Sequence, residues 1–468
     1  MYSLFDAKHV HLVGIKGVAM TALAQMLVGL GKTVTGSDVE EEFVTEKILA
    51  QLGVEIFVDF SPEHLHASTD YLVFSGAHNG SSNPEVLAAK EKKIPVVSHA
   101  EALGQMMQGK TGISVCGVGG KSTVTAMIAW ILEFAGEKPS YSIGVGQARN
   151  LGRTGKYIKE SALMVVEADE YATDPGIDNT PRFMFQTPTV TVCTNLEYDH
   201  PDVYSSMEDV QQAYLKFFQK LPNGGTLVIN GENAELKNLV TQVNKQIAIV
   251  DISSTPSNAW HYSNYTAVKG KNTLQFSAQG RECTVDLVVP GKFNALNALY
   301  AVAAATAVGV PIEKALAAMK LFTGTMRRFE DKGIKHGVQY YDDYAHHPTE
   351  IVATLSALRE WYPKNHVIAA FQSHTYSRTK MLLNEFAHAF AQADEVVLID
   401  IFPSAREAFD PTVTSDLLAE KIVETGKPAK NLKTIQEAKE YIEKTVKPGD
   451  VVMTLGAGDL YHIHELLS

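Results

Sequence analysis

A glycine-rich segment between an apolar run and an amphipathic helix pattern is the part of this sequence best suited to chemistry. It reads CGVGGKSTVTAMIAWILEF, and its helix pattern starts at Lys121 and Ser122. Glycines let backbone N–H groups turn towards phosphate oxygens, a helix N-terminus favours negative charge, a lysine reaches the terminal phosphates and a hydroxyl can ligate Mg²⁺. The segment therefore predicts a site for a nucleoside triphosphate. Its expected contacts are Gly117, Gly119, Gly120, Lys121, Ser122 and Thr123.

The spacing of this loop differs from that of the usual phosphate-binding loop. The usual loop has a glycine six residues before the lysine, and Val115 occupies that position here. The segment therefore matches a shorter loop, and the alternative is an incidental glycine turn before a core helix. The agreement of strand, loop, Lys–Ser pair and helix favours the phosphate-binding interpretation.

Two later apolar runs end in groups that could serve a metal ion. Residues 163–166 lead into EADE, and residues 189–194 lead into NLEYDH. Because ligands bind beyond the carboxyl ends of parallel strands, both segments can face the loop. Each charged residue taken alone could also be a solvated loop charge. The candidates for binding Mg²⁺ and positioning a nucleophile are Glu167, Asp169, Glu170, Asp199 and His200.

The elements that must position these groups indicate an α/β protein. Short β-rich runs alternate with longer helix patterns almost throughout, which is typical of parallel sheets with crossover helices. The first unit runs from a strand at 9–13 through Gly14 and a helix pattern at 18–30 to Asp38. We expect further strands at 113–116, 337–341, 366–371, 395–401 and 450–455, and a helix pattern at 297–321.

The length and two breaks predict three domains. A chain of 468 residues suggests about three domains at roughly 150 residues each. A polar stretch at 108–112 and a second break at 322–325 divide the chain. The predicted domains are residues 1–109, 110–323 and 324–468.

The composition excludes several classes of protein. With 45% hydrophobic and 20% charged residues, the chain has an ordinary globular composition. Its net charge of -12 argues against a general nucleic-acid binder, and runs such as 301–308 are shorter than the ~20 apolar residues that cross a bilayer. Three scattered cysteines do not suit a disulfide framework or a cysteine-based zinc site. We expect a cytoplasmic protein that binds neither nucleic acid nor membrane.

Four segments spread over nearly the whole chain resemble the Mur ligase family. They are GIKGVAMTALA, GVGGKST with EADE and NLEYDH, PGKFNALNAL, and DDYAHHPTE with FQSHTYSRT. The resemblance implies a Rossmann-like domain that binds a UDP-sugar, a central phosphate-loop domain with a parallel or mixed sheet that binds ATP, and a Rossmann-like C-terminal domain that binds an amino acid. The protein would be a monomer or a homodimer.

The resemblance also implies a reaction. An ATP-dependent, ADP-forming ligase would join L-alanine, or another small amino acid, to the lactyl carboxylate of UDP-N-acetylmuramate during synthesis of the peptidoglycan precursor. The carboxylate would attack the γ-phosphate to give an acyl phosphate, and the amine would then displace phosphate. ATP and Mg²⁺, with two metal ions, would be required.

Individual residues acquire roles from the same resemblance. Lys121 and Ser122 would hold ATP and the first metal ion, while Glu167 and His200 would serve the metals. Further ATP contacts would be Asn294, Asn297, Arg327, with its neighbour Arg328, and Asp343. The amino acid would face His346, His374 and Arg378. The sugar nucleotide would lie at Gly14, Gly17, Asp38, Ser75 and His78, although a glycine turn followed by an acid 24 positions later also describes a dinucleotide site.

Several of these residues have structural alternatives. The asparagines could cap the helix that follows them, the arginine pair could be solvated, and His346 with His347 could be structural residues at a helix start before Pro348. Lys216 corresponds in position to a lysine that other Mur ligases carboxylate, and a surface or core position is its alternative.

The chain also departs from the family pattern. Val118 and Gly119 replace Thr and His, Tyr171 and Ala172 replace Ser and Asp, Phe293 replaces His, and Thr375 replaces Arg. We therefore expect the ATP-binding groups to be retained and the sugar and amino-acid contacts to be altered. Lys380 is the nearest cation that could replace the missing arginine.

Three other functions are alternatives. A murein peptide ligase would attach a recycled tripeptide to the same sugar nucleotide, and FQSHTYSRT disfavours it. A nicotinamide-dependent oxidoreductase would leave the phosphate loop without a role. A regulator that binds nucleotide without catalysis is disfavoured by the presence of Lys121, Glu167 and His200.

Overall fold

The computed structural model describes residues 2–403 and 407–467, which form two compact units. The first unit comprises residues 2–264, 274–286 and 296–322, and the second comprises residues 265–273, 287–295 and the described part of 323–467. The fold is α/β, as predicted. The division into three domains stays a prediction.

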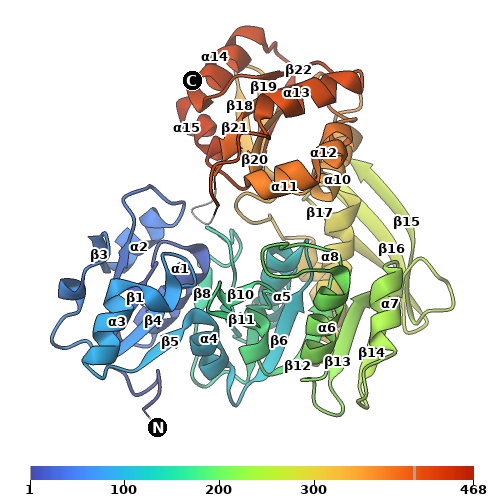
Figure 1. The fold of residues 1–468 in the computed structure, drawn as a ribbon. Coiled ribbons are helices and arrows are strands. Elements are labelled where there is room, and N and C mark those ends of the chain that lie inside the picture. The colour runs from blue at the N-terminus through green and yellow to red at the C-terminus, as the bar shows by residue number, and fades with distance from the viewer. Residues whose placement is uncertain (1, 404–406, 468) are drawn as a thin grey trace. The chain divides into compact units, whose positions relative to one another are not determined.

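The N-terminal part of the first unit is a five-stranded parallel sheet, blue in Figure 1, with strand order β3-β2-β1-β4-β5. Its strands are β1 (His9–Val13), β2 (Thr33–Asp38), β3 (Glu55–Val58), β4 (Tyr71–Phe74) and β5 (Val96–Ser98). Its helices are α1 (Val18–Gly29), α2 (Glu46–Leu52), α3 (Pro84–Glu91) and α4 (His99–Met107), with 3₁₀ turns η1 (Pro62–His64) and η2 (Gly80–Ser82). The strand order reverses between β1 and β4, and ligands of such sheets commonly bind beyond the carboxyl ends of the strands at this reversal. The predicted strand at 9–13 is confirmed.

A ten-stranded sheet forms the rest of the first unit and continues into strands shared with the second, in the order β17-β16-β15-β14-β13-β12-β6-β9-β7-β8. Its strands are β6 (Thr111–Cys116), β7 (Ser140–Ser142), β8 (Gly155–Lys156), β9 (Leu163–Glu167), β12 (Pro188–Cys193), β13 (Thr226–Asn230), β14 (Ala248–Ser253), β15 (Trp260–Val268), β16 (Lys271–Ala278) and β17 (Arg281–Leu287). The helices are α5 (Lys121–Ala135), α6 (Met207–Phe218), α7 (Ala234–Val240), α8 (Lys292–Ala307) and α9 (Ile312–Met319), with a 3₁₀ turn η3 (Arg182–Phe185) and a separate hairpin, β10 (Ala172–Asp174) and β11 (Asp178–Pro181).

Strand register brings the predicted chemical groups to one edge of this sheet. β6 lies between β9 and β12 and is parallel to both, with Val115 opposite Glu167 and Cys116 opposite Cys193. The glycine loop after β6 and the acidic segments after its neighbours therefore leave the sheet side by side.

The second unit contains a six-stranded sheet with order β18-β19-β23-β20-β21-β22, antiparallel only between β18 and β19. Its strands are β18 (Glu330–Lys335), β19 (Val338–Asp343), β20 (Val367–His374), β21 (Glu395–Phe402), β22 (Ala429–Asn431) and β23 (Val451–Leu455). Its helices are α10 (Pro348–Trp361), α11 (Tyr376–Met381), α12 (Leu383–Ala389), α13 (Ser415–Glu424), α14 (Ile435–Thr445) and α15 (Ile463–Leu466), with a 3₁₀ turn η4 (Leu460–His462).

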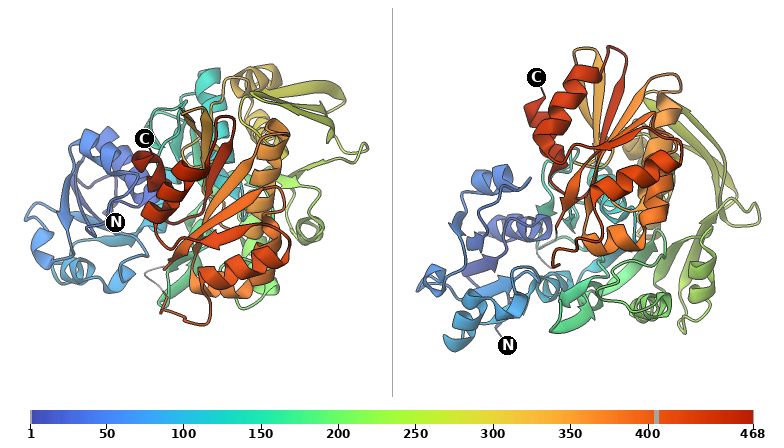
Figure 2. Two further views of the ribbon diagram at one scale, coloured as in Figure 1. Left: turned by 90° about the horizontal axis from the view of Figure 1, so that it is seen from above. Right: turned by 45° about the horizontal axis from the view of Figure 1, so that its top comes forward.

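Helices cover both faces of this sheet (Figure 2), and alternating residues of its strands pack against them. Val367, Ala369 and Phe371 of β20 belong to the core under α10, α12 and α13, whereas Ile368 and Ala370 belong to the core under α14. A sheet covered on both faces requires continuous apolar runs, which is why the strands were visible in the sequence.

The structure corrects one sequence-based element. The helix pattern at 297–321 forms two helices, α8 and α9, because Gly309 adopts a φ of 97° and Pro311 caps the second helix.

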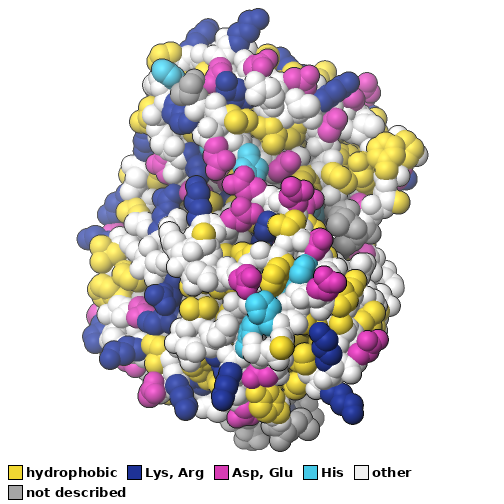
Figure 3. Space-filling model, turned by 90° about the vertical axis from the view of Figure 1, so that its left-hand side faces the viewer, with side chains coloured by type: hydrophobic (Ala, Val, Ile, Leu, Met, Phe, Trp, Pro, Cys, Tyr) yellow, Lys and Arg dark blue, Asp and Glu magenta, His cyan; other side chains and the backbone are white. Residues whose placement is uncertain are grey.

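None of the helices formed by residues 2–403 and 407–467 combines the length and apolar character needed to span a membrane. The three cysteines are free thiols. Charged side chains of both signs are interspersed over the face seen in Figure 3.

A fully buried carboxylate joins several elements of the N-terminal sheet. Glu85 accepts hydrogen bonds from Ser37 Oγ, from His11 Nε2 at 3.2 Å, from His64 Nδ1 at 2.7 Å and from the Ser61 N–H at 3.2 Å. A carboxylate only accepts, so both histidine nitrogens must carry the proton. Burial alone would raise the pKa of Glu85, but the hydrogen bonds from His11, Ser37 and His64 outweigh burial and hold the pKa below its ordinary value.

We expect Glu85→Gln to lower the free energy of unfolding by about 3 kcal/mol, because the amide nitrogen donates where the site requires an acceptor and the histidines lose a buried charge partner. Urea unfolding at pH 7 measures the change. Glu91→Gln, at the exposed end of the same helix, is the control and should stay within about 0.5 kcal/mol of wild type.

The same change has an expected pH dependence. Because the pKa of Glu85 is lowered in the folded protein, its stabilisation is present above the unfolded pKa and disappears as pH falls through the folded pKa. A Glu85→Gln variant as stable as wild type at pH 7 would contradict this role.

Candidate functional site

The loop between β6 and α5 has the backbone that its glycines suggested. Gly117 and Gly120 adopt φ values of 123° and 86°, in the region that favours glycine. A side chain at Gly117 would collide with Thr194 Oγ1, and a Cβ at Gly120 would lie 2.8 Å from Asn297 Oδ1. The Gly119 N–H donates to Asn195 Oδ1 at 3.0 Å, so the segment after β12 supports the loop.

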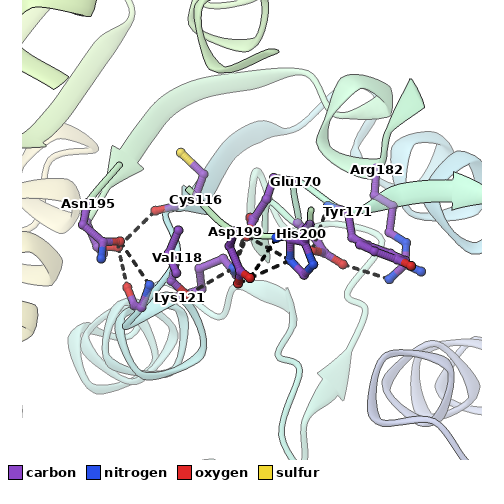
Figure 4. Close-up of polar contacts among 12 residues, drawn as sticks. Cys116, Val118, Lys121, Glu170, Tyr171, Arg182, Asn195, Asp199 and His200 are labelled. Atoms are coloured by element: carbon purple, nitrogen blue, oxygen red, sulfur yellow. Dashed lines mark hydrogen bonds and ion pairs between the residues drawn. The ribbon is translucent and has the colours of Figure 1, made fainter. Parts of the chain in front are cut away.

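Lys121 forms an ion pair with Glu170 at the mouth of this loop (Figure 4). Its Nζ lies 2.9 Å and 3.1 Å from the two carboxylate oxygens of Glu170, whose side chain is almost completely buried. Burial opposes the charge of Lys121, but Glu170 and Asp169 outweigh it and raise the pKa of the lysine. The lysine therefore stays charged and available to a phosphate oxygen.

His200 completes this cluster from the segment after β12. Its Nε2 lies 3.6 Å from Glu170 Oε1 and 3.8 Å from Asp199 Oδ2 (Figure 4). Burial would lower the pKa of His200, but the hydrogen bond that His200 donates to Glu170 and the charge of Asp199 raise it. The structure thus brings Lys121 and His200 together around Glu170.

Glu167 has a different immediate environment. Its Oε1 accepts the Gly144 N–H at 2.5 Å, and its carboxylate contributes to the electrostatic environment of Lys121. Glu167 also lines a cavity of about 190 Å³ together with His99, Asp169 and Arg182. Sequence reasoning named both glutamates of EADE but singled out Glu167, because no pattern tells which acid beyond a strand end turns towards the loop.

The donor set fits magnesium and phosphate. Ser122 and Thr123 lie in the first turn of α5, both nearly buried, so the Ser122 hydroxyl is placed beside the loop. Within the part of the chain that the structure describes, no three of the His, Cys, Asp and Glu side chains form a group that could hold a metal by itself. Mg²⁺ usually combines one or two carboxylates with phosphate oxygens and water, so Ser122, Glu170 and Glu167 suit it as partial ligands.

Four of the residues predicted to bind the sugar nucleotide lie together at the carboxyl edge of the N-terminal sheet. Gly14 has a φ of 81°, and a Cβ there would lie 3.0 Å from the Ser75 Cβ and 3.5 Å from His78 Cδ2. Asp38 Oδ1 lies 3.2 Å from His78 Nε2, and Asp38 Oδ2 accepts the Lys16 N–H at 2.7 Å. Gly17, the fifth, precedes α1 as its N-cap.

The arginine pair of the second unit divides into two environments. Arg327 donates to Asp342 and to the carbonyls of Gly456 and Gly458, and its guanidinium stacks on Tyr344 and Tyr461. Arg328 stacks on Tyr344, and its charge partly offsets the rise that burial causes in the pKa of Asp343. The side chain of Arg327 is therefore held inside its own domain, which makes Arg328 the better placed partner for a ligand.

Asp343 is buried at the end of β19. Its two oxygens accept the Ala345 and Phe329 N–H groups at 2.7 Å and 2.6 Å. Burial raises the pKa of Asp343 to about 7, although Arg328 and these two N–H groups act in the opposite direction. Asp343 therefore changes charge near neutral pH.

The histidines of DDYAHHPTE have separate positions. His347 caps α10 by accepting the Thr349 N–H at 3.4 Å, so the structural interpretation holds for this residue. His346 lies with its ring 6.5 Å from that of His374 at the end of β20. The two rings are therefore neighbours, and their contact with the amino acid stays a prediction.

Thr375 and its neighbours form the start of α11. The Thr375 hydroxyl accepts the Arg378 N–H at 3.4 Å as the helix cap, with a φ of 73°. Arg378 is nearly buried, whereas Lys380 pairs with Asp410 at 2.9 Å. Lys380 is therefore paired with Asp410 in this structure, and its role as a replacement for an arginine at position 375 stays a prediction.

Three further residues named from the sequence have separate positions in the structure. Asn294, in the first turn of α8, donates from Nδ2 to the Pro290 carbonyl at 2.7 Å, whereas Asn297 lies against Gly120. Lys216 is exposed on α6, which agrees with the surface alternative.

Comparisons with known proteins cover the whole chain. Three family profiles match: "Mur ligase family, catalytic domain" over residues 9–111, "Mur ligase middle domain" over 115–305 and "Mur ligase, glutamate ligase domain" over 327–458. A UDP-N-acetylmuramate–L-alanine ligase of Desulfitobacterium hafniense is 37% identical over 98% of this chain and 99% of its own, and one of Trichlorobacter lovleyi is 35% identical over 99% and 98%.

Solved structures give the same similarity. The UDP-N-acetylmuramate-alanine ligase MurC of Thermotoga maritima matches with a TM-score of 0.82 and 25% identity over 98% of both chains. A murein peptide ligase of Psychrobacter arcticus matches with a TM-score of 0.70, also with 25% identity over 98% of both chains.

We expect Lys121→Ala to reduce turnover of any reaction that moves the γ-phosphoryl group by about a thousandfold or more, because the lysine charge stabilises charge that develops in the transition state. Steady-state ADP release measures the effect. Lys156→Ala is the matched control, since it removes a partly buried lysine paired with Glu133 away from the loop. Near-normal turnover of Lys121→Ala would refute the loop assignment.

Asp343→Asn should change how stability depends on pH. Because the folded pKa of about 7 lies above the unfolded value of about 3.9, the stability from this group is full below the unfolded pKa and is lost as pH rises through 7. Relative to the variant, wild type should therefore lose about 2.5 kcal/mol between pH 5 and pH 8. Urea unfolding at both pH values tests this, with the exposed Asp416→Asn as a control whose difference stays constant.

Proposed function

The chain belongs to the Mur ligase family, and from that membership we propose how its residues divide the work of joining L-alanine to UDP-N-acetylmuramate. The enzyme is an ATP-dependent, ADP-forming amide ligase of peptidoglycan precursor synthesis. Full-length similarity to L-alanine ligases supports the amino acid and the sugar nucleotide.

The observation that carries the proposed mechanism is the Lys121–Glu170–His200 cluster beside the loop. In the first step, an oxygen of the muramate carboxylate bonds to the γ-phosphorus, and the bond to ADP breaks. Lys121 moves from Glu170 to the γ-phosphate oxygens and compensates the charge that develops there. The products of this step are an acyl phosphate and ADP.

In the second step, the amine of L-alanine attacks the acyl carbon, and phosphate leaves with the electron pair of the broken C–O bond. The amine must lose a proton to form the neutral amide. His346 and His374, whose rings meet in the second unit, are the proposed partners of the amino acid, and Arg378 is proposed to pair with its carboxylate.

Magnesium, when bound, lowers the charge repulsion between the carboxylate and the triphosphate and orients the γ-phosphate. Ser122 and Glu170 would be its ligands. Glu167 and His200 would be further ligands or would orient the ligands. Gly117, Gly119 and Gly120 place the loop backbone around the phosphates, and Asn297 lies against the loop.

The three sequence domains divide the substrates in this proposal. Residues 1–109 bind the sugar nucleotide through Gly14, Gly17, Asp38, Ser75 and His78. Residues 110–323 bind ATP. Residues 324–468 bind L-alanine and contribute Asp343 and the arginine pair, and the enzyme acts in the cytoplasm as a monomer or homodimer.

The alternatives have less support. The murein peptide ligase is structurally similar, but its TM-score of 0.70 is lower than the 0.82 of the L-alanine ligase. An oxidoreductase would leave the loop lysine and its glutamate partner without a role.

ADP release with UDP-N-acetylmuramate tests the function. We expect turnover that depends on L-alanine and Mg²⁺, with glycine and L-serine as weaker substrates and a meso-diaminopimelate-containing tripeptide as a non-substrate. Release of ADP with the tripeptide and none with L-alanine would instead identify a murein peptide ligase. Mass spectrometry of the product distinguishes ligation from ATP hydrolysis.

A further inference from the structure

Both ends of the hairpin β10–β11 lie beside the proposed nucleotide site. Tyr171, which follows Glu170, directly precedes β10, and Arg182 directly follows β11. The Arg182 N–H donates to the Tyr171 carbonyl at 3.0 Å, and the Phe183 N–H donates to the Asp169 carbonyl at 3.0 Å. The base of the hairpin is thus tied to the acidic segment that holds Lys121.

Tyr171 fixes several groups at that base (Figure 4). Its ring lies 4.8 Å from the His200 ring, its hydroxyl donates to Asp202 at 2.6 Å, and the Arg182 guanidinium lies 5.4 Å over its face. Arg182 in turn pairs with Asp169 at 2.8 Å. His200 has a φ of 58°, a conformation that a non-glycine residue keeps only when its surroundings hold it. The contact between the Tyr171 and His200 rings contributes to this restraint on His200.

Further along β10, the hairpin contacts the turn at residues 75–82 of the N-terminal sheet. Asp174 is buried and accepts the Ser81 N–H at 3.1 Å. Gly76 and Gly80 allow this approach, because a Cβ at Gly76 would lie 2.5 Å from the Thr173 carbonyl oxygen and one at Gly80 would collide with Asp174 Oδ1. The same turn carries Ser75 and His78, the candidate contacts of the sugar nucleotide.

We propose that Tyr171 and Asp174 are positioning residues and that the hairpin between them couples the binding of the sugar nucleotide to the binding of Mg–ATP. The inference rests on the proposed function. A sugar nucleotide held at the 75–82 turn stabilises the turn against Asp174, and the hairpin transmits this order to Tyr171 and to His200 beside Glu170. Coupling between two sites is reciprocal, so each ligand must tighten the other by the same factor.

Isothermal titration calorimetry with a non-hydrolysable ATP analogue and Mg²⁺, with and without saturating UDP-N-acetylmuramate, measures this factor. We expect about fivefold or more tightening in wild type, in both orders of addition. Asp174→Ala should reduce the factor to below about twofold while leaving the affinity for the ATP analogue alone near wild type. Tyr171→Leu should also abolish the coupling and weaken binding of the ATP analogue alone. Tyr171→Phe retains the ring and should keep most of the coupling.

Two controls separate coupling from a general loss of structure. Asp178→Ala changes the residue opposite Asp174 in the backbone register of the hairpin, whose side chain accepts the Thr180 N–H at 2.9 Å instead of contacting the 75–82 turn through Ser81, so wild-type coupling is expected. Tyr71→Leu removes a buried, hydrogen-bonded tyrosine of the N-terminal sheet. It should lower the free energy of unfolding, but the coupling factor measured on the folded protein should equal that of wild type.

The outcomes are distinguishable. Wild-type coupling in Asp174→Ala, or binding of both ligands to wild type without mutual effect, would overturn the inference and leave the proposed function intact. A wild-type protein that fails to bind UDP-N-acetylmuramate would overturn the proposed function and the inference with it. Because the two variants act at opposite ends of the hairpin, loss of folding in one leaves the other as the test.

Discussion

The parallel register of β6 with β9 and β12 is the constraint on which the nucleotide site depends. It ends three strands at one edge, so a glycine loop, an acidic segment and a histidine-bearing segment leave the sheet together. The apolar side chains that are buried on these strands set this register, and the backbone hydrogen bonds between the strands then form in it. Lys121, Glu170 and His200 come from segments far apart in the chain, and they meet because the strands before them are neighbours.

Sequence patterns predicted those strands well, since β6, β9 and β12 are buried on both faces and read as apolar runs. They predicted less about the side chains beyond the strand ends. Which of Glu167 and Glu170 contacts Lys121 depends on how the chain turns after β9. The guanidinium of Arg327 donates to carbonyls of Gly456 and Gly458, which are distant in sequence. Such contacts carry no local periodicity.

The hairpin β10–β11 was also not predictable from local sequence patterns. Its strands are only three and four residues long, and they contain Asp, Asn and Pro, which are depleted in strands. Its place is set by Asp174 and by two glycines of another segment, Gly76 and Gly80. Tyr171, first noticed as a departure from the family pattern, thereby acquires a physical role in contacts with His200, Arg182 and Asp202.

The Lys121–Glu170 ion pair also bears on the end of the catalytic cycle. In the proposed mechanism, the loop would hold ADP after amide formation, with inorganic phosphate near the same lysine. Glu170 belongs to the protein itself, and its Oε1 lies 2.9 Å from Lys121 Nζ, so its carboxylate competes with any bound anion for the charge of the lysine. An internal counter-ion of this kind would weaken the binding of ADP and phosphate more than that of ATP, whose longer phosphate chain would make more contacts with the loop.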